Sequence, residues 1–504
     1  MKNKILVRLL LALLMLCMVF SAVACDKDTE NDSTGTKPEG ETEEEVVTYP
    51  FEIEDLGDEE GHPTRFNMIV RTERCDYIYA EQDGSLIHDA VFERNALVEE
   101  LFNVEISMFE GGHSEAKEYV GNITNDVMSG SGAYDCVLAW DGSGLEMRGW
   151  YMNLLTFPEL RFNEDDWWFK DWNTNGIVND CLITCNGDLQ FEIYYDIEVI
   201  FYNKTLAAAI EMNPYPYVDN KTWTIEQMEI FSSQIKQEDS VNGGWIGEDG
   251  AIDSKKEDFY ASDAVYGSLF NQSVGTPSMF ALGAKYSVVH DDGIEWTIAK
   301  ESNYNIFEKL YSVMRETDWN VVYQTTTLGE GSYKLFNENR ALFCWNAVRV
   351  GEFIKPSGVQ YGLLPIPMYN EDQGEYITTC YGHSYFAFLT TTPDFHRSAL
   401  VFNAMNALSS EILYDTYFGE ILAFRYADDP DSSRMVPLIR DSLYFDYTWT
   451  NSTLCSGVAH IFGNQLISGN KNIASSVSGQ ERALDLLMAK YIKQYENMRI
   501  ANSR

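Results

Sequence analysis

The sequence predicts an α/β fold, from the order of its elements and from one buried strand. Residues 65–71 alternate apolar and polar side chains, 87–102 repeat apolar side chains at helical spacing, and 104–108 alternate again. A strand, a helix and a strand in this order form a parallel crossover. Residues 134–140 are a nearly continuous apolar run before the glycine-rich loop 141–144, which predicts a strand buried on both faces. Ligands of open α/β sheets bind beyond the carboxyl ends of such strands.

The later elements follow from the same patterns. The apolar run 189–202 has a polar break at 194–196, which predicts one strand passing between two sheets at a hinge. Thr224 and Gln227 form a capping pair that opens a helix. Further predicted elements are a helix at 306–314, strands at 341–345 and 361–367, and a second long apolar run at 376–389.

Residues 1–24 have the pattern of an export signal. A basic head precedes the apolar run 9–20, which is too short to span a bilayer. Small residues at 22–24 and the cysteine after them resemble the lipobox of bacterial lipoproteins. This resemblance implies cleavage after residue 24 and diacylation of Cys25, whereas in an ordinary signal peptide Cys25 would be a bystander.

Residues 25–48 predict an acidic, disordered tether that begins at the lipidated Cys25. Nine carboxylates stand against two lysines there, separated mostly by serine, threonine, glycine and proline. We therefore expect a lipid-anchored protein on the extracellular or periplasmic face of a membrane. A formal net charge of −42 at pH 7 argues against a nucleic-acid partner.

The cysteines and the known catalytic motifs give no sign of an enzyme or a metal site. After the predicted cleavage site the mature chain has seven cysteines besides Cys25, an odd number that is widely spread, so we expect buried small side chains rather than a disulfide framework. The sequence has no Gly-x-Ser-x-Gly, no His-Glu-x-x-His, no P-loop and no Cys/His metal spacing. We therefore expect no enzymatic activity, no metal and no cofactor.

Four stretches of the sequence resemble the extracellular solute-binding proteins of ABC importers, the group typified by maltodextrin-binding proteins. They occur in the family's order and cover most of residues 64–430. The stretches are 94–104, 134–137, 200–204 with 222–224, and 336–343 with 361–367.

The resemblance implies a two-lobed, periplasmic-binding-protein-like type II fold, with hinge crossings and a solute bound between the lobes. We expect an N-lobe from 49–194 and 345–383, and a C-lobe from 195–344 and 384–504. The crossings would lie near 192–196, 341–345 and 381–386. The implied partners are a small-molecule solute and a membrane permease, and a monomer is expected.

Candidate ligand-binding residues follow from these positions. Two stand at strand ends of the N-lobe, five at the predicted crossings, and one after a strand of the C-lobe. They are Arg71 and Asp141, then Tyr195, Asp196, Trp345, His383 and Tyr385, then Asn271.

The mixture of rings and hydrogen-bonding groups suits a sugar, whose faces are apolar and whose edge carries hydroxyl groups. An oligosaccharide is therefore the first hypothesis. A peptide or another polar solute on the same scaffold is the second. A surface glycoside hydrolase is the third, although 78 carboxylates make chance pairs uninformative.

Overall fold

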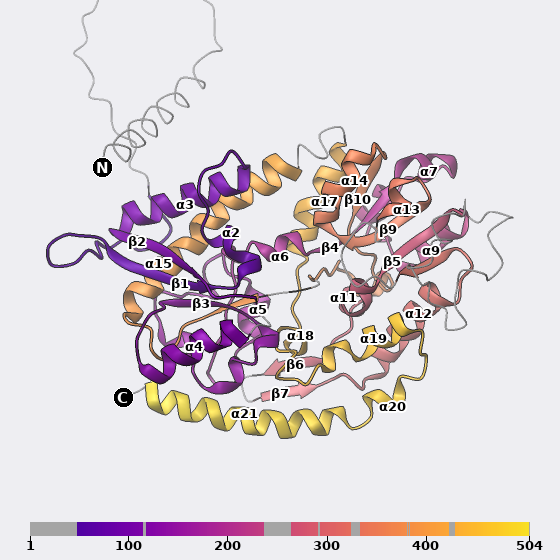
Figure 1. The fold of residues 1–504 in the computed structure, drawn as a ribbon. Helices are drawn as coiled ribbons and strands as arrows, with labels where there is room; N and C mark the ends of the chain where they lie inside the picture. Colours follow the sequence, from indigo (N-terminus) through magenta and orange to yellow (C-terminus); the bar gives the residue numbers. More distant parts are fainter. Residues whose placement is uncertain are drawn as a thin grey trace, which may run out of the picture. The chain divides into compact units, whose positions relative to one another are not determined.

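The computed structural model describes residues 48–113, 117–235, 264–290, 293–323, 333–380, 382, 384–422 and 429–502 (Figure 1). The predicted signal and almost all of the tether, with Cys25, lie outside these residues. The described strands form a four-stranded sheet, a five-stranded sheet and a two-stranded hairpin. No helix in the described ranges is both long enough and apolar enough to cross a membrane.

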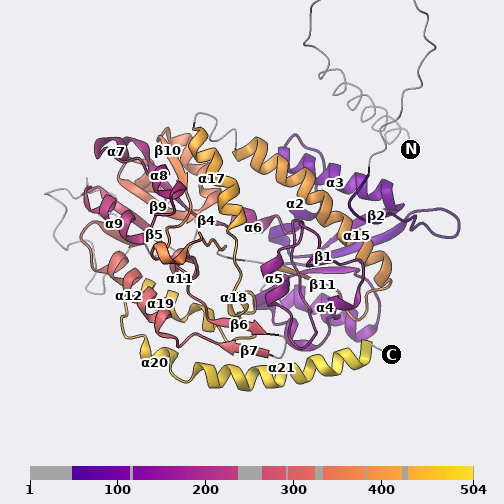
Figure 2. The same ribbon diagram turned by 180° about the vertical axis from the view of Figure 1, so that it is seen from behind.

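The first lobe is built on the four-stranded sheet. Its central strand β1 pairs in parallel with β2 and β3, and β11 adds antiparallel to β3. Figures 1 and 2 show α3 and α15 on one face of this sheet and α4 on the opposite face. The parallel crossover predicted from the sequence is confirmed. The elements are β1 (Thr64–Val70), α2 (Cys75–Ile78), α3 (Leu86–Phe102), β2 (Val104–Glu110), α4 (Lys117–Ser129), β3 (Cys136–Trp140), β11 (Ser384–Ala387) and α15 (Phe395–Leu408).

The second lobe is built on the five-stranded sheet, in the order β10-β4-β9-β5-β8. All seven residues of β9 are buried, as expected for a central strand. The strands are β4 (Glu198–Asn203), β5 (Tyr266–Asn271), β8 (Asn320–Tyr323), β9 (Ala341–Ala347) and β10 (Tyr361–Leu364). The helices are α7 (Lys204–Ala209), α8 (Tyr215–Asp219), α9 (Ile225–Ser233), α11 (Gly275–Ala281), α12 (Glu301–Arg315), α13 (Lys334–Asn337), α14 (Gly351–Ile354), α17 (Pro430–Asp441) and α19 (Ile461–Ser468).

The remaining elements connect or flank the lobes. The long helix α21 packs along the hairpin β6–β7, where the Trp296 indole donates to Asp485 at 3.0 Å. The helix α6 lies between the two sheets in Figure 1 and Figure 2. Their bounds are α5 (Lys170–Asn175), α6 (Glu192–Tyr195), β6 (Ser287–His290), β7 (Gly293–Trp296), α18 (Tyr447–Thr450), α20 (Ala474–Val477) and α21 (Gln480–Asn502).

The sheets correct the predicted lobe boundaries after residue 344. Residues 345–383 were expected in the N-lobe, but the end of β9 and all of β10 belong to the second lobe, because β10 pairs with β4. Residues 384–504 were expected in the C-lobe, but β11 pairs with β3 in the first lobe. The crossing expected at 341–345 is also wrong, since β9 runs wholly inside the five-stranded sheet.

The passage between the lobes at 192–196 has a different form from the predicted strand. The backbone of Cys185 forms an isolated antiparallel β-bridge with Phe386 of β11 in the first lobe, and Glu198 begins β4 in the second lobe. Between them the chain forms the short helix α6 rather than a continuous strand. The seven described cysteines are all buried, which confirms their prediction as small core residues.

Candidate functional site

A cavity of about 650 Å³ lies between the two lobes. Its walls come from α2 and the start of α3 in the first lobe, and from α14 and the turn after it in the second. Tyr195 of α6, the helix between the sheets, completes the lining. The lining residues are Glu73, Asp76, Tyr77, Ser85, Leu86, Ile87, His88, Tyr195, Glu352, Lys355 and Pro356.

Two of the lining residues are tyrosines whose rings contact each other. The ring centroids of Tyr77 and Tyr195 are 5.4 Å apart, and Tyr195 packs in turn on Tyr417 at 4.8 Å. Tyr417 is fully buried, so it fixes the position of the Tyr195 ring from behind. The cavity therefore has an aromatic wall held by the core.

A charged network joins the lobes below this wall. Glu192 is the first residue of α6, and Asp196 follows its last residue, about one turn further along. Arg74 of the first lobe pairs with Glu192 and lies 3.9 Å from Asp196. Arg349, which follows β9 of the second lobe, pairs with Asp196 at 3.0 Å. Burial raises the pKa of Asp196 to about 6, although Arg349 opposes that rise. One arginine from each lobe thus meets the carboxylates at the passage between them.

The first lobe adds a second contact to this network. Arg71 follows the carboxyl end of β1, and its Nη1 donates to Ser384 Oγ at 2.8 Å. The Ser384 hydroxyl donates to Glu192 at 3.1 Å. Residue Asp141 directly follows β3, the strand that pairs with both β1 and β11. The carboxyl ends of the first-lobe strands therefore face the passage, as open α/β sheets predict.

A third feature of the site is a set of buried polar side chains at the adjoining end of the five-stranded sheet. Glu198 begins β4 and is fully buried, and neither of its carboxyl oxygens accepts a well-formed hydrogen bond from the described residues. Burial raises the pKa of Glu198 to about 8, the nearby Asp196 adds to the rise, and Arg349 and the Ser273 hydroxyl oppose it. Several other polar atoms at this end of the sheet also form no hydrogen bond of good geometry within the described residues, namely Asn271 Nδ2, Ser273 Oγ, Trp345 Nε1, Asn346 Nδ2 and Thr379 Oγ1.

The structure brings three of the predicted site residues to the passage between the lobes. Arg71, Tyr195 and Asp196 take part in the contacts described above, and Asp141 follows the neighbouring strand. Asn271 ends β5 in the second lobe, where its side chain accepts from the backbone of Ser273 at 3.3 Å. His383 lies outside the described residues.

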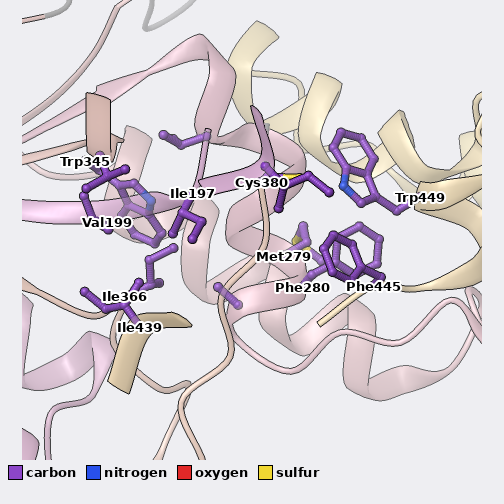
Figure 3. Packing of buried hydrophobic residues seen from close by; sticks show 14 of the residues in the cluster. Ile197, Val199, Met279, Phe280, Trp345, Ile366, Cys380, Ile439, Phe445 and Trp449 are labelled. Atoms are coloured by element: carbon purple, nitrogen blue, oxygen red, sulfur yellow. The ribbon is translucent and has the colours of Figure 1, made fainter. Parts of the chain in front are cut away.

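The two remaining predicted residues are buried side chains. Trp345 is 1% exposed and packs against Phe270, and Figure 3 shows it within the cluster of buried hydrophobic residues. Tyr385 is also 1% exposed, and its hydroxyl donates to Glu146 at 2.9 Å within the first lobe. In this conformation neither side chain is accessible from the cavity.

Sequence reasoning missed Arg74, Glu192, Glu198 and Arg349. Glu198 had a detectable signal, because it is a carboxylate inside the apolar run 197–201 and a strand with such a residue needs a partner for it. Arg74 and Arg349 had no such signal in the sequence, because their ion pairs with Glu192 and Asp196 depend on how the two lobes come together around α6.

No protein-family model matches the sequence, and no curated relative matches it either. Solved structures do match in fold. The maltose-binding periplasmic protein of Listeria monocytogenes in complex with maltose aligns with 85% of this chain and 99% of its own, at 12% identity and a TM-score of 0.51. The fold is that of the two-lobed solute-binding proteins.

Two further structures support the same fold. The maltose-bound MalE3 of T. maritima aligns with 84% of this chain and 100% of its own, at 11% identity and a TM-score of 0.50. An ABC substrate-binding protein of Listeria monocytogenes in complex with cycloalternan aligns with 85% and 99%, at 12% identity and a TM-score of 0.50. Identities this low establish the fold and leave the solute of this chain to its own residues.

Proposed function

We propose that this chain is the substrate-binding lipoprotein of an ABC importer and captures an oligosaccharide between its two lobes. The observation that carries the proposal is the cavity between the lobes, with an aromatic wall and hydrogen-bonding groups from both sides. On the two-lobed fold a solute that contacts both lobes favours the closed arrangement, because only closure makes both sets of contacts at once.

The lining chemistry supports a sugar. The rings of Tyr77 and Tyr195 can cover the apolar face of a sugar ring, and the carboxylates Glu73, Asp76 and Glu352 can accept from its hydroxyl groups. The role is binding and delivery rather than catalysis, and it uses no metal or cofactor.

The predicted anchor belongs to the same proposal. Lipidated Cys25 and the tether to residue 48 would keep the lobes near a membrane permease, on the extracellular or periplasmic face. Cys25→Ala should release the protein from the membrane fraction into the medium or periplasm. Unchanged membrane fractionation of this variant would overturn the anchor.

A cationic peptide is the second candidate, because three carboxylates line the cavity against one lysine. Asp76 is exposed at this lining and separates the two candidates. Asp76→Asn should weaken a cationic solute strongly and a neutral sugar only slightly, because only the former loses a charge interaction. Glu226→Gln on α9, away from the cavity lining, is the matched control.

A thermal-shift screen tests the proposal. The purified protein is heated with neutral oligosaccharides, among them maltose, cellobiose and xylobiose, and with lysine-rich peptides. A solute at one hundred times its Kd stabilises the folded state by about 2.7 kcal/mol, which gives a clear upward shift of Tm. A shift with peptides alone would replace the sugar with a peptide, and no shift with either class would contradict solute capture of this kind.

A further inference from the structure

Four buried side chains of the second lobe have hydrogen-bonding atoms that form no hydrogen bond of good geometry within the described residues, although the Ser273 hydroxyl also acts on the Glu198 carboxyl. They are the carboxyl oxygens of Glu198, the indole Nε1 of Trp345 and the hydroxyl groups of Ser273 and Thr379. Each of these residues is at most 4% exposed. We call them the inner polar group. Because native proteins pair the large majority of their buried polar atoms, four unmet groups in one place indicate a missing partner.

The strand register places these side chains together. Glu198 of β4 pairs with Ala347 of β9, two residues beyond Trp345, so Glu198 and Trp345 point to the same face of the sheet. On the other side of β4, Ile197 bridges antiparallel to Cys380, and the amide of Glu198 donates to the carbonyl of Thr379 at 3.1 Å.

Ser273 completes the group from the segment after β5. Its hydroxyl lies close enough to the Glu198 carboxyl to oppose the rise of that pKa. Glu198, Thr379 and Ser273 therefore lie at the start of β4, directly after the passage through α6 and beside the Asp196–Arg349 ion pair, and Trp345 lies on the same face of the sheet opposite Ile200.

The inner polar group carries little charge, and this indicates which kind of solute it could bind. Since burial raises the pKa of Glu198 to about 8, the carboxyl is largely protonated at neutral pH, and it then both donates and accepts. The other three atoms are neutral as well. The two arginines described nearby, Arg74 and Arg349, already pair with Glu192 and Asp196, so neither is an unpaired cation for an anionic solute.

We propose that the inner polar group is a subsite for neighbouring hydroxyl groups of an uncharged solute. A hydroxyl group donates one hydrogen bond and accepts others, as does each of Glu198, Ser273 and Thr379. The atoms are covered in this conformation, so the solute reaches them when the lobes separate around α6. The subsite rests on the proposed function, since it holds the solute on the second-lobe side.

Two adjacent threonines provide the test. Thr379→Val removes a hydroxyl without a partner, whereas Thr378→Val removes one that accepts from Ser442 Oγ at 2.7 Å. Both substitutions keep the side-chain shape, and both residues are fully buried. Thr379→Val should leave Tm unchanged or raise it by about 2 °C, and Thr378→Val should lower it.

Calorimetry with the sugar that gives the largest shift among maltose, cellobiose and xylobiose completes the test. Thr379→Val and Ser273→Ala should each weaken binding at least tenfold, and Thr378→Val should bind like the wild type. A lower Tm for Thr379→Val would show that its hydroxyl is structural and would overturn the subsite. A higher Tm with unchanged affinity would overturn the subsite and leave the proposed function standing. If none of the three sugars binds the wild type, both ideas fail for neutral sugars.

Discussion

Each lobe has a buried hydroxyl group beside its sheet, and these hydroxyl groups, of Tyr385 in the first lobe and Thr379 in the second, differ in whether the fold supplies a partner. In the first lobe the Tyr385 hydroxyl donates to Glu146 and lies 3.3 Å from the Tyr151 hydroxyl. In the second lobe the described residues leave Glu198 and Thr379 with unmet atoms. A satisfied group stabilises the fold, whereas an unsatisfied group costs free energy that a solute can recover. The comparison therefore assigns stability to the first group and binding to the second.

The largest expected effect is on stability, and it comes from replacing Trp345. Two substitutions distinguish the contribution of the ring's packing from that of its indole N–H group. Trp345→Ala should lower the free energy of unfolding by about 3–5 kcal/mol, because it empties a large volume in the core beside Phe270. Trp345→Phe keeps most of that volume and removes the N–H, so it should lose far less stability and still weaken sugar binding. Urea unfolding and calorimetry measure the two properties. Equal stability losses in both variants would place the cost in the N–H instead.

The next effect concerns the first lobe. Tyr385→Phe should lower the free energy of unfolding by about 1–3 kcal/mol, because one oxygen of Glu146 loses its donor in a buried site. Solute affinity should stay unchanged, since the side chain faces the first-lobe core. A variant as stable as the wild type but with weaker binding would reverse the assignment of the two groups.

The third effect is a pH dependence from Glu198. Its folded pKa of about 8 lies above the ordinary value of 4.5, so the folded state holds the proton more tightly. Its contribution to stability is complete below pH 4.5 and is lost as the pH rises toward 8, by at most about 1.4 kcal/mol per pH unit.

Glu198→Gln isolates that contribution, because glutamine cannot titrate while Asp196, with a pKa of about 6, remains in place. The wild type should lose more stability than the variant between pH 5 and 8 in urea unfolding. Parallel curves would show that Glu198 is not protonated in the folded protein.

Much of the first lobe could be predicted from the sequence because its signals are local. The alternation in β1 and β2 and the helical spacing in α3 are visible within a few residues. The lobe boundaries after residue 344 could not be predicted in this way, because they depend on contacts between residues far apart in the chain. β10 and β11 are both short apolar strands, and only their partners, β4 and β3, decide which sheet each joins.

The site shows the same limit. Arg71 was accessible from the sequence because a strand end predicts a position at the sheet edge. The network of Arg74, Asp196 and Arg349 joins residues far apart in the chain, so no spacing rule connects them. An aromatic residue such as Tyr385 looks the same in sequence whether its hydroxyl meets a solute or Glu146, and only the contact distinguishes them.

A solute that contacts both lobes should close them around it. Small-angle X-ray scattering of the wild type, with and without a saturating concentration of the sugar that gives the largest thermal shift, tests this closure most directly. We expect a smaller radius of gyration with the sugar, and no change for the Ser273→Ala, Thr379→Val double variant at the same concentration. A sugar that binds the wild type by calorimetry and leaves its radius of gyration unchanged would contradict capture between the lobes.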